Sequence, residues 1–72
     1  MAEKKWRTYI ADRNGREIYE DDRVRISGGI DYSGRVIYDT TDAAFVVSPD
    51  NEMEDGYQLG YLAKNYCVEV IA

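Results

Sequence analysis

The sequence predicts a small all-β domain of five to six short antiparallel strands, curled into a barrel. Apolar and polar residues alternate over short stretches, as they do in half-buried strands. Turn-forming residues separate these stretches at intervals of about 8 to 12 residues. No stretch keeps a helical period of 3.6 over three turns. With 72 residues, the chain has room for one domain, spanning 1–72.

The first predicted strand is "KKWRTYIA", where Trp6, Thr8 and Ile10 share one face. The next residues, "DRNG", predict a tight hairpin turn. Gly15 follows Asn14, and both residue types tolerate a positive φ. Asp12 can accept hydrogen bonds from nearby backbone amides. Asp12, Asn14 and Gly15 are therefore the predicted structural turn.

The later elements follow the same alternation. In order, they are "REIYEDD" with an acidic interruption, the strands "RVRIS", "RVIYD" and "AFVVS", the polar loop "PDNEMEDG", and the strands "YQLGYLA" and "YCVEVIA" around Lys64-Asn65. The apolar member of each alternating pair belongs to one expected core. Its predicted members are Trp6, Ile18, Val24, Ile26, Val36, Phe45, Val47 and Val70.

The net charge of −5 is unevenly distributed along the chain. Residues 1–16 carry five basic and two acidic side chains, and a basic first strand is expected over 3–10. The acidic body, 17–72, has four basic side chains against twelve carboxylates. We expect the basic segment to pair with the body. A body this acidic repels phosphates, which argues against nucleic acid as the partner.

The residue inventory argues against an enzyme. The chain has one cysteine and no histidine, so it lacks the usual catalytic base, an intrachain disulfide and a zinc-ligand set. Cys67 is expected to pack as a small apolar side chain. The acidic loop from Asp50 to Gly56 has the wrong spacing for an EF-hand. We therefore expect no cofactor and no metal. No apolar run is long enough to span a membrane and the start lacks a secretory signal, which indicates the cytoplasm.

The segment "DRNGREIYEDDRV" resembles the D-x-N-G-x-x-I-Y-E-G-D-x-V pattern of the YopX family, small proteins of phages and mobile elements. Asp21 stands where that family has glycine. Further along, "GRVIYD" resembles the family's G-x-V-x-Y strand, and "CVEVIA" resembles its C-x-E-V-I-G-N-I ending. The residues on the first pattern are Asp12, Asn14, Gly15, Ile18, Tyr19, Glu20, Asp22 and Val24. The resemblance implies an SH3-like β-barrel and carries no established activity, so it transfers no catalytic residue.

Two further similarities point to the same topology. "GYLAKNYCVEVI" is similar to the G-Y-I-P-S-N-Y-V-E-L-I ending of signalling SH3 domains, with Tyr66 at the position of a groove tyrosine and Ala63 in place of the proline. "DDRVRISGGIDYSGRV" resembles KOW segments, which occur in SH3-like barrels that bind RNA or ribosomes. Both similarities favour a barrel.

These observations predict a non-enzymatic binding or accessory module that contacts a protein partner. The candidate contact surface comprises Tyr57, Tyr61 and Tyr66, because tyrosine is enriched at protein interfaces. Two alternatives stay open: an acidic inhibitor that mimics nucleic acid, and a KOW-like nucleic-acid-binding barrel. The final strand "YCVEVIA" has no charged or proline guard at its end, so pairing with a second copy as a homo-oligomer is a further expectation.

Overall fold

The computed structural model of the protein describes residues 5–50 and 56–71. This part of the chain is mostly β-structure, which confirms the predicted all-β class. In order, the elements are β1 (Arg7–Ala11), β2 (Glu17–Tyr19), β3 (Arg23–Ser27), β4 (Tyr32–Asp39), β5 (Ala44–Pro49), β6 (Tyr57–Gln58), α1 (Leu59–Asn65) and β7 (Cys67–Val70).

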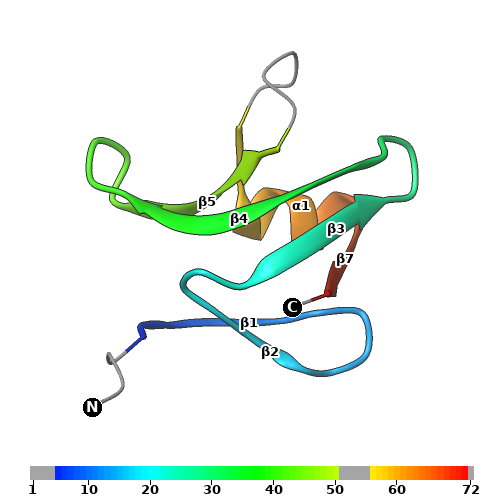
Figure 1. Ribbon diagram of the computed structural model, residues 1–72, viewed down its shortest axis with the longest axis horizontal. Helices are drawn as coiled ribbons and strands as arrows, with labels where there is room; N and C mark the ends of the chain where they lie inside the picture. The colour runs from blue at the N-terminus through cyan, green and yellow to red at the C-terminus, as the bar shows by residue number, and fades with distance from the viewer. Residues whose placement is uncertain (1–4, 51–55, 72) are drawn as a thin grey trace.

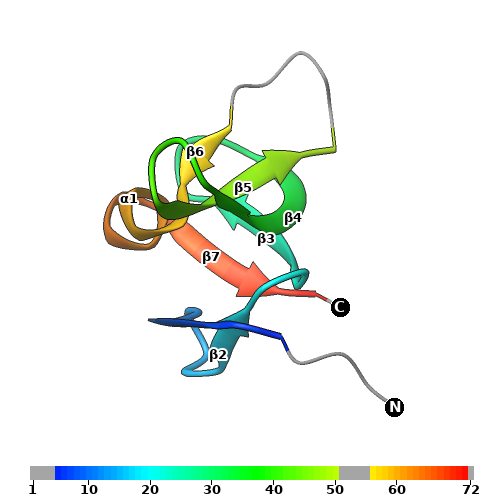
Figure 2. The same cartoon turned by 90° about the vertical axis from the view of Figure 1, so that its left-hand side faces the viewer.

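The strands form two antiparallel sheets. Five strands pair in the order β6-β5-β4-β3-β7, while β1 and β2 form a separate hairpin. The hairpin lies across one side of the larger sheet, next to β7 and α1 (Figures 1 and 2). No ladder joins the hairpin to either edge of the larger sheet among the described strands, so the predicted barrel is not closed.

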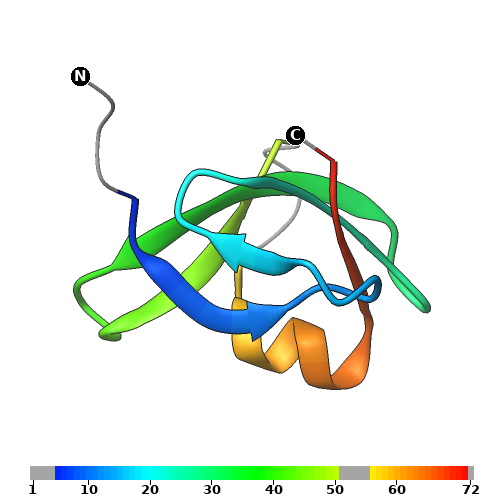
Figure 3. The same cartoon turned by 90° about the horizontal axis from the view of Figure 1, so that it is seen from below.

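The core is built from side chains of the larger sheet, from Ile18 of β2 and from Leu59 and Leu62 of α1. The hairpin and α1 lie next to each other beside that sheet (Figure 3). Val24 and Ile26 of β3 lie opposite Val70 and Val68 of β7, so their side chains share the inner face of the sheet. Six predicted core residues are buried: Ile18, Val24, Ile26, Val36, Val47 and Val70. Phe45 is partly buried and packs against them.

Trp6 was predicted to lie in the core, and this prediction is wrong. Its side chain is 60% exposed and rests against the ring of Tyr38, with 5.7 Å between the ring centroids. The pairing of β1 with β2 is irregular between Arg7 and Ile10, and Tyr9 has a φ of +62°. A bulge of this kind breaks the alternation of faces along a strand, so Trp6 need not follow the face of Ile10.

The predicted strand "YQLGYLA" is also wrong beyond its first two residues. Only Tyr57–Gln58 is extended, and Leu59–Asn65 forms α1. Leu59 and Leu62 are fully buried, and their spacing of three residues places both on the inner side of the helix. No side chain caps the first turn of the helix. Burial of Leu59 and Leu62 is therefore the main interaction that stabilises it.

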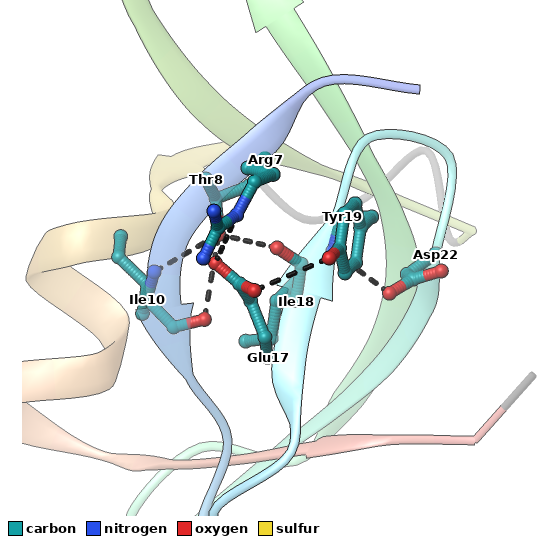
Figure 4. A network of polar contacts seen from close by, with 7 residues as sticks. All are labelled: Arg7, Thr8, Ile10, Glu17, Ile18, Tyr19 and Asp22. Carbon is teal, nitrogen blue, oxygen red and sulfur yellow. Dashed lines mark hydrogen bonds and ion pairs between the residues drawn. The ribbon is translucent and has the colours of Figure 1, made fainter. Parts of the chain in front are cut away.

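The acidic step between β2 and β3 is a tight turn. The carboxylate of Asp22 accepts a hydrogen bond from the backbone N–H of Tyr19 at 2.8 Å, and Asp21 has a φ of +71° (Figure 4). The backbone N–H of Asp21 donates to the carbonyl of Val36. The turn is therefore tied to β4.

Most of the predicted polar loop after β5, residues 51–55, lies outside the described residues.

Candidate functional site

The three predicted contact tyrosines lie together. Tyr57 comes from β6, Tyr61 from α1 and Tyr66 from the residue that follows α1. The rings of Tyr57 and Tyr61 stack at 6.0 Å between centroids, and Tyr61 meets Tyr66 edge-on at 6.2 Å. Both arrangements are favoured by the quadrupoles of aromatic rings. We call these three residues the tyrosine cluster.

Two members of the cluster, Tyr57 and Tyr61, are exposed, whereas Tyr66 is partly buried against the core. With Leu59 and Leu62 turned inward, Tyr61 is left 50% exposed, and Tyr57 is 39% exposed. On the other side, Tyr66 lies over Gly29, where an added Cβ would stand 3.1 Å from the Tyr66 ring. A glycine at this position therefore lets the ring approach the backbone closely.

The hydroxyl groups of the cluster interact with one another. Charge repulsion from Tyr61 and a hydrogen bond with its hydroxyl both raise the pKa of Tyr66 above its ordinary value of 10.0. The Tyr66 hydroxyl therefore stays protonated at neutral pH. As a result, Tyr66 presents an uncharged ring whose hydroxyl can donate or accept a hydrogen bond.

A cavity of about 240 Å³ adjoins the cluster at Tyr66. It lies where the β1–β2 turn, the end of α1 and the start of β7 meet. Its lining residues are Ala11, Asp12, Arg13, Ala63, Tyr66, Cys67 and Val68. Cys67 is a free cysteine of intermediate burial. The cavity is smaller than the roughly 300–1,000 Å³ typical of sites for drug-sized ligands, so it suits a single side chain.

Asp12 forms one wall of the cavity and fixes the hairpin turn. Its Oδ1 accepts hydrogen bonds from the backbone N–H groups of Asn14 at 2.9 Å and Arg16 at 2.8 Å. Its Oδ2 accepts a third from Val70 at 3.0 Å. Gly15 has a φ of +84°, so the predicted turn at Asp12, Asn14 and Gly15 is present, with the positive φ it requires.

The carboxylate of Asp12 is almost fully buried, and only 7% of the residue is exposed. Burial alone would disfavour the charged form. The three backbone donors, from Val70, Arg16 and Asn14, outweigh it and lower the pKa of Asp12 below its ordinary value. Asp12 is therefore a charged structural anchor at neutral pH.

The same turn covers the outer edge of β7. The Val70 N–H is bound by Asp12, and the Val68 carbonyl accepts a 2.8 Å hydrogen bond from the backbone N–H of Arg13. The inner edge of β7 pairs with β3. The Val70 N–H and the Val68 carbonyl are therefore not free to pair with a neighbouring copy, which limits the expected strand pairing at this edge.

A second polar network lies on the hairpin itself (Figure 4). Arg7 donates to Glu17 at 3.0 Å, and the Tyr19 hydroxyl donates to the other oxygen of Glu17 at 3.2 Å. Thr8 donates to the Ile18 carbonyl at 2.6 Å and accepts from the Ile10 N–H. These contacts join β1 to β2 across the bulge and give the network a structural role.

Within residues 5–50 and 56–71, no group of three or more acidic, cysteine or histidine side chains is placed to hold a metal ion. The predicted acidic loop from Asp50 to Gly56 falls largely outside these ranges. No helix among the described residues is long and apolar enough to cross a membrane.

Sequence reasoning found the tyrosines and the turn but missed the cavity between them. Its lining comes from three segments, and the contact between Asp12 and Val70 spans 58 positions. No local pattern carries that information.

A comparison with protein-family models, with curated proteins and with solved structures finds no match to this chain.

Proposed function

We propose that this protein is a non-enzymatic binding or accessory module that contacts a protein partner through the tyrosine cluster. The observation that carries the proposal is the position of three tyrosines, two of them at least 39% exposed, in ring contact on one side of a very small domain. Tyrosine offers a large apolar face and a hydroxyl at low entropic cost, which is why it is enriched at binding hot spots.

The absence of enzymatic activity is part of the same proposal. It is supported by the lack of histidine in the sequence and by the state of Asp12, the carboxylate of which is buried. Three backbone donors occupy Asp12 and lower its pKa, so it is a poor proton carrier near neutral pH.

We further propose that the chain is a YopX-like protein of phage or mobile-element origin that acts in the cytoplasm. The backbone at Asp21 supports this relationship. Asp21 stands at the position of the family's glycine and has a φ of +71°, a conformation that glycine adopts without strain. The cytoplasmic assignment is supported by Cys67, a free thiol in a chain with no second cysteine.

The test compares Tyr61 with Tyr9, a matched tyrosine on β1 that is 79% exposed and outside the cluster. A photo-crosslinking amino acid is placed at either position, and adducts formed in the source cells are identified by mass spectrometry. We expect a specific protein adduct from position 61 that is absent from position 9.

The affinity of the purified partner is then measured for Tyr61→Ala and Tyr9→Ala. A hot-spot tyrosine is worth about 2 kcal/mol or more, so Tyr61→Ala should weaken binding roughly 30-fold while Tyr9→Ala has little effect. Equal crosslinking from both positions, or equal affinities, would contradict the proposal. An adduct of twice the protein's own mass would identify a second copy as the partner.

A further inference from the structure

Two cations border the tyrosine cluster. Arg13 lines the cavity next to Tyr66, and its backbone is held there by the bond to Val68. Lys64 follows Tyr61 by three positions on α1, so the two side chains are neighbours on the helix surface. Both cations are exposed, and within the described ranges neither forms an ion pair.

Three other cations are compensated by carboxylates. Arg7 pairs with Glu17, Arg23 with Asp50 and Arg25 with Asp31. Lys5, Arg16 and Arg35 form no ion pair among the described residues either, but none of them lines the cavity at Tyr66. The body from residue 17 onward has only four basic side chains against twelve acidic ones. Lys64 is one of those four, and it stands with Arg13 beside the exposed aromatic surface without a carboxylate partner in the described structure.

We propose that the partner presents an acidic peptide segment to this surface. An apolar or aromatic side chain of the segment lies on the tyrosine cluster, and carboxylates beside it bind Arg13 and Lys64. One further side chain of the segment enters the cavity at Tyr66. This inference rests on the proposed function and specifies the chemistry of the partner.

The electrostatics favour a short acidic peptide over nucleic acid. The guanidinium of Arg13 matches a carboxylate in a bidentate geometry, and the Lys64 ammonium adds a second point charge. The peptide's carboxylates lie next to these two cations at the rim, while the charged Asp12 in the cavity wall is bound by three backbone N–H donors. Salt screens the remaining acidic side chains beyond a Debye length of about 8 Å. A nucleic acid would extend its phosphates over the rest of a protein with a net charge of −5.

The test selects binding peptides from a random library, so the partner need not be identified first. A phage-displayed library of random 12-residue peptides is panned on the full chain in 150 mM salt, and the strongest sequence is synthesised with a fluorescent label. A second version replaces every Asp and Glu by Asn and Gln. We expect enrichment of acidic residues beside an apolar or aromatic one, and at least tenfold weaker binding of the amide version in fluorescence anisotropy.

Matched double variants then locate the effect on the protein. Arg13→Gln with Lys64→Gln should weaken the acidic peptide about tenfold or more and bring its affinity close to that of the amide version. Lys5→Gln with Arg35→Gln removes the same charge from exposed positions and should leave the affinity nearly unchanged. Circular dichroism checks that each variant is folded. An equal loss in both double variants would overturn the inference, because it would show a general charge effect.

The outcomes separate this inference from the proposed function. If selected peptides depend on Tyr61 but carry no acidic excess, or bind equally in the amide version, the inference fails and the proposed function stands. If no selected peptide depends on Tyr61, both fail. Labelled 15-nucleotide oligo-dT and oligo-U are measured in parallel. Submicromolar binding that is lost in the Arg13/Lys64 variant would assign the cations to nucleic acid and overturn the inference.

Discussion

At the scale of single residues, the buried carboxylate of Asp12 accepts several backbone hydrogen bonds from different parts of the chain. It accepts three backbone hydrogen bonds, and its loss would leave the Asn14, Arg16 and Val70 amides without that partner. We expect Asp12→Asn to lower the free energy of unfolding by roughly 3 kcal/mol, because one acceptor is replaced by an amide donor that faces N–H groups. Urea unfolding measures this, with Asp42→Asn as an exposed control that should change stability by less than about 0.5 kcal/mol.

The lowered pKa of Asp12 also predicts a pH dependence. Its folded-state pKa lies below the ordinary value of 3.8, so the stabilisation by its ionised form is complete above that value. This stabilisation is lost as the pH falls through the folded-state pKa. We expect wild-type stability to fall as the pH drops below about 4 and the Asp12→Asn variant to show a shallower fall. Parallel urea titrations across this range would contradict the assignment if the two slopes were the same.

Asp21 predicts a stabilising substitution. Its φ of +71° places a Cβ in a region that costs non-glycine residues about 1 kcal/mol, and within the described structure its side chain makes no hydrogen bond. Asp21→Gly should therefore raise the free energy of unfolding by a few tenths to about 1 kcal/mol, with the higher entropy of unfolded glycine reducing the gain. Asp21→Ala keeps the Cβ and should not gain. A melting temperature lower for glycine than for alanine would count against this explanation.

At this scale, the sequence correctly predicted the features that depend on residues close together in the chain. Asp12, Asn14 and Gly15 form a turn whose bonds span two to four positions, so residue type alone indicated it. Trp6 was misplaced because its face depends on the bulge at Tyr9. A tyrosine with positive φ has no local signature, since most tyrosines in strands keep a negative φ.

At the scale of elements, the close pairing of β4 with β5 depends on Gly34. A Cβ at this position would lie 2.3 Å from the Ser48 carbonyl oxygen, which is backbone and cannot rotate away. Gly34→Ala should therefore destabilise the protein by roughly 2 kcal/mol or more, as overpacking does in other cores. Gly15→Ala is the contrasting variant, since its Cβ meets nothing within 4 Å and the expected cost of about 1 kcal/mol comes from φ alone. Thermal unfolding that ranks Gly15→Ala as the more damaging would refute the steric argument.

The missed helix shows a limit of periodicity at the same scale. α1 has seven residues, fewer than two full turns, and only Leu59 and Leu62 mark its buried side. Over so short a stretch, a helical and a strand pattern cannot be distinguished. The helix is nevertheless what turns Tyr61 outward and toward its two partners, so the ring contacts of the cluster could not be derived from the sequence even though its members could.

At the scale of the whole molecule, the sequence predicted the class of fold but not how the hairpin is seated. Alternating strands and turn residues indicated an antiparallel all-β domain. The hairpin position depends on contacts such as Asp12 to Val70 and Arg13 to Val68, which join residues more than 50 positions apart. These same contacts create the cavity at Tyr66 and bring Arg13 to its rim. The candidate site is therefore a property of the assembled chain.

The packing of the hairpin against β7 also affects how strongly the protein resists aggregation at high concentration. A hairpin that detaches while the larger sheet stays intact would expose the Val68 carbonyl and the Val70 N–H as a template for another chain. Aggregation would then begin from a locally opened molecule, and its rate would rise with the opened fraction. Weakening the Asp12 anchor would accelerate it at temperatures well below the melting transition. The turn thus protects the molecule against its own copies by shielding a strand edge that is otherwise ready to pair.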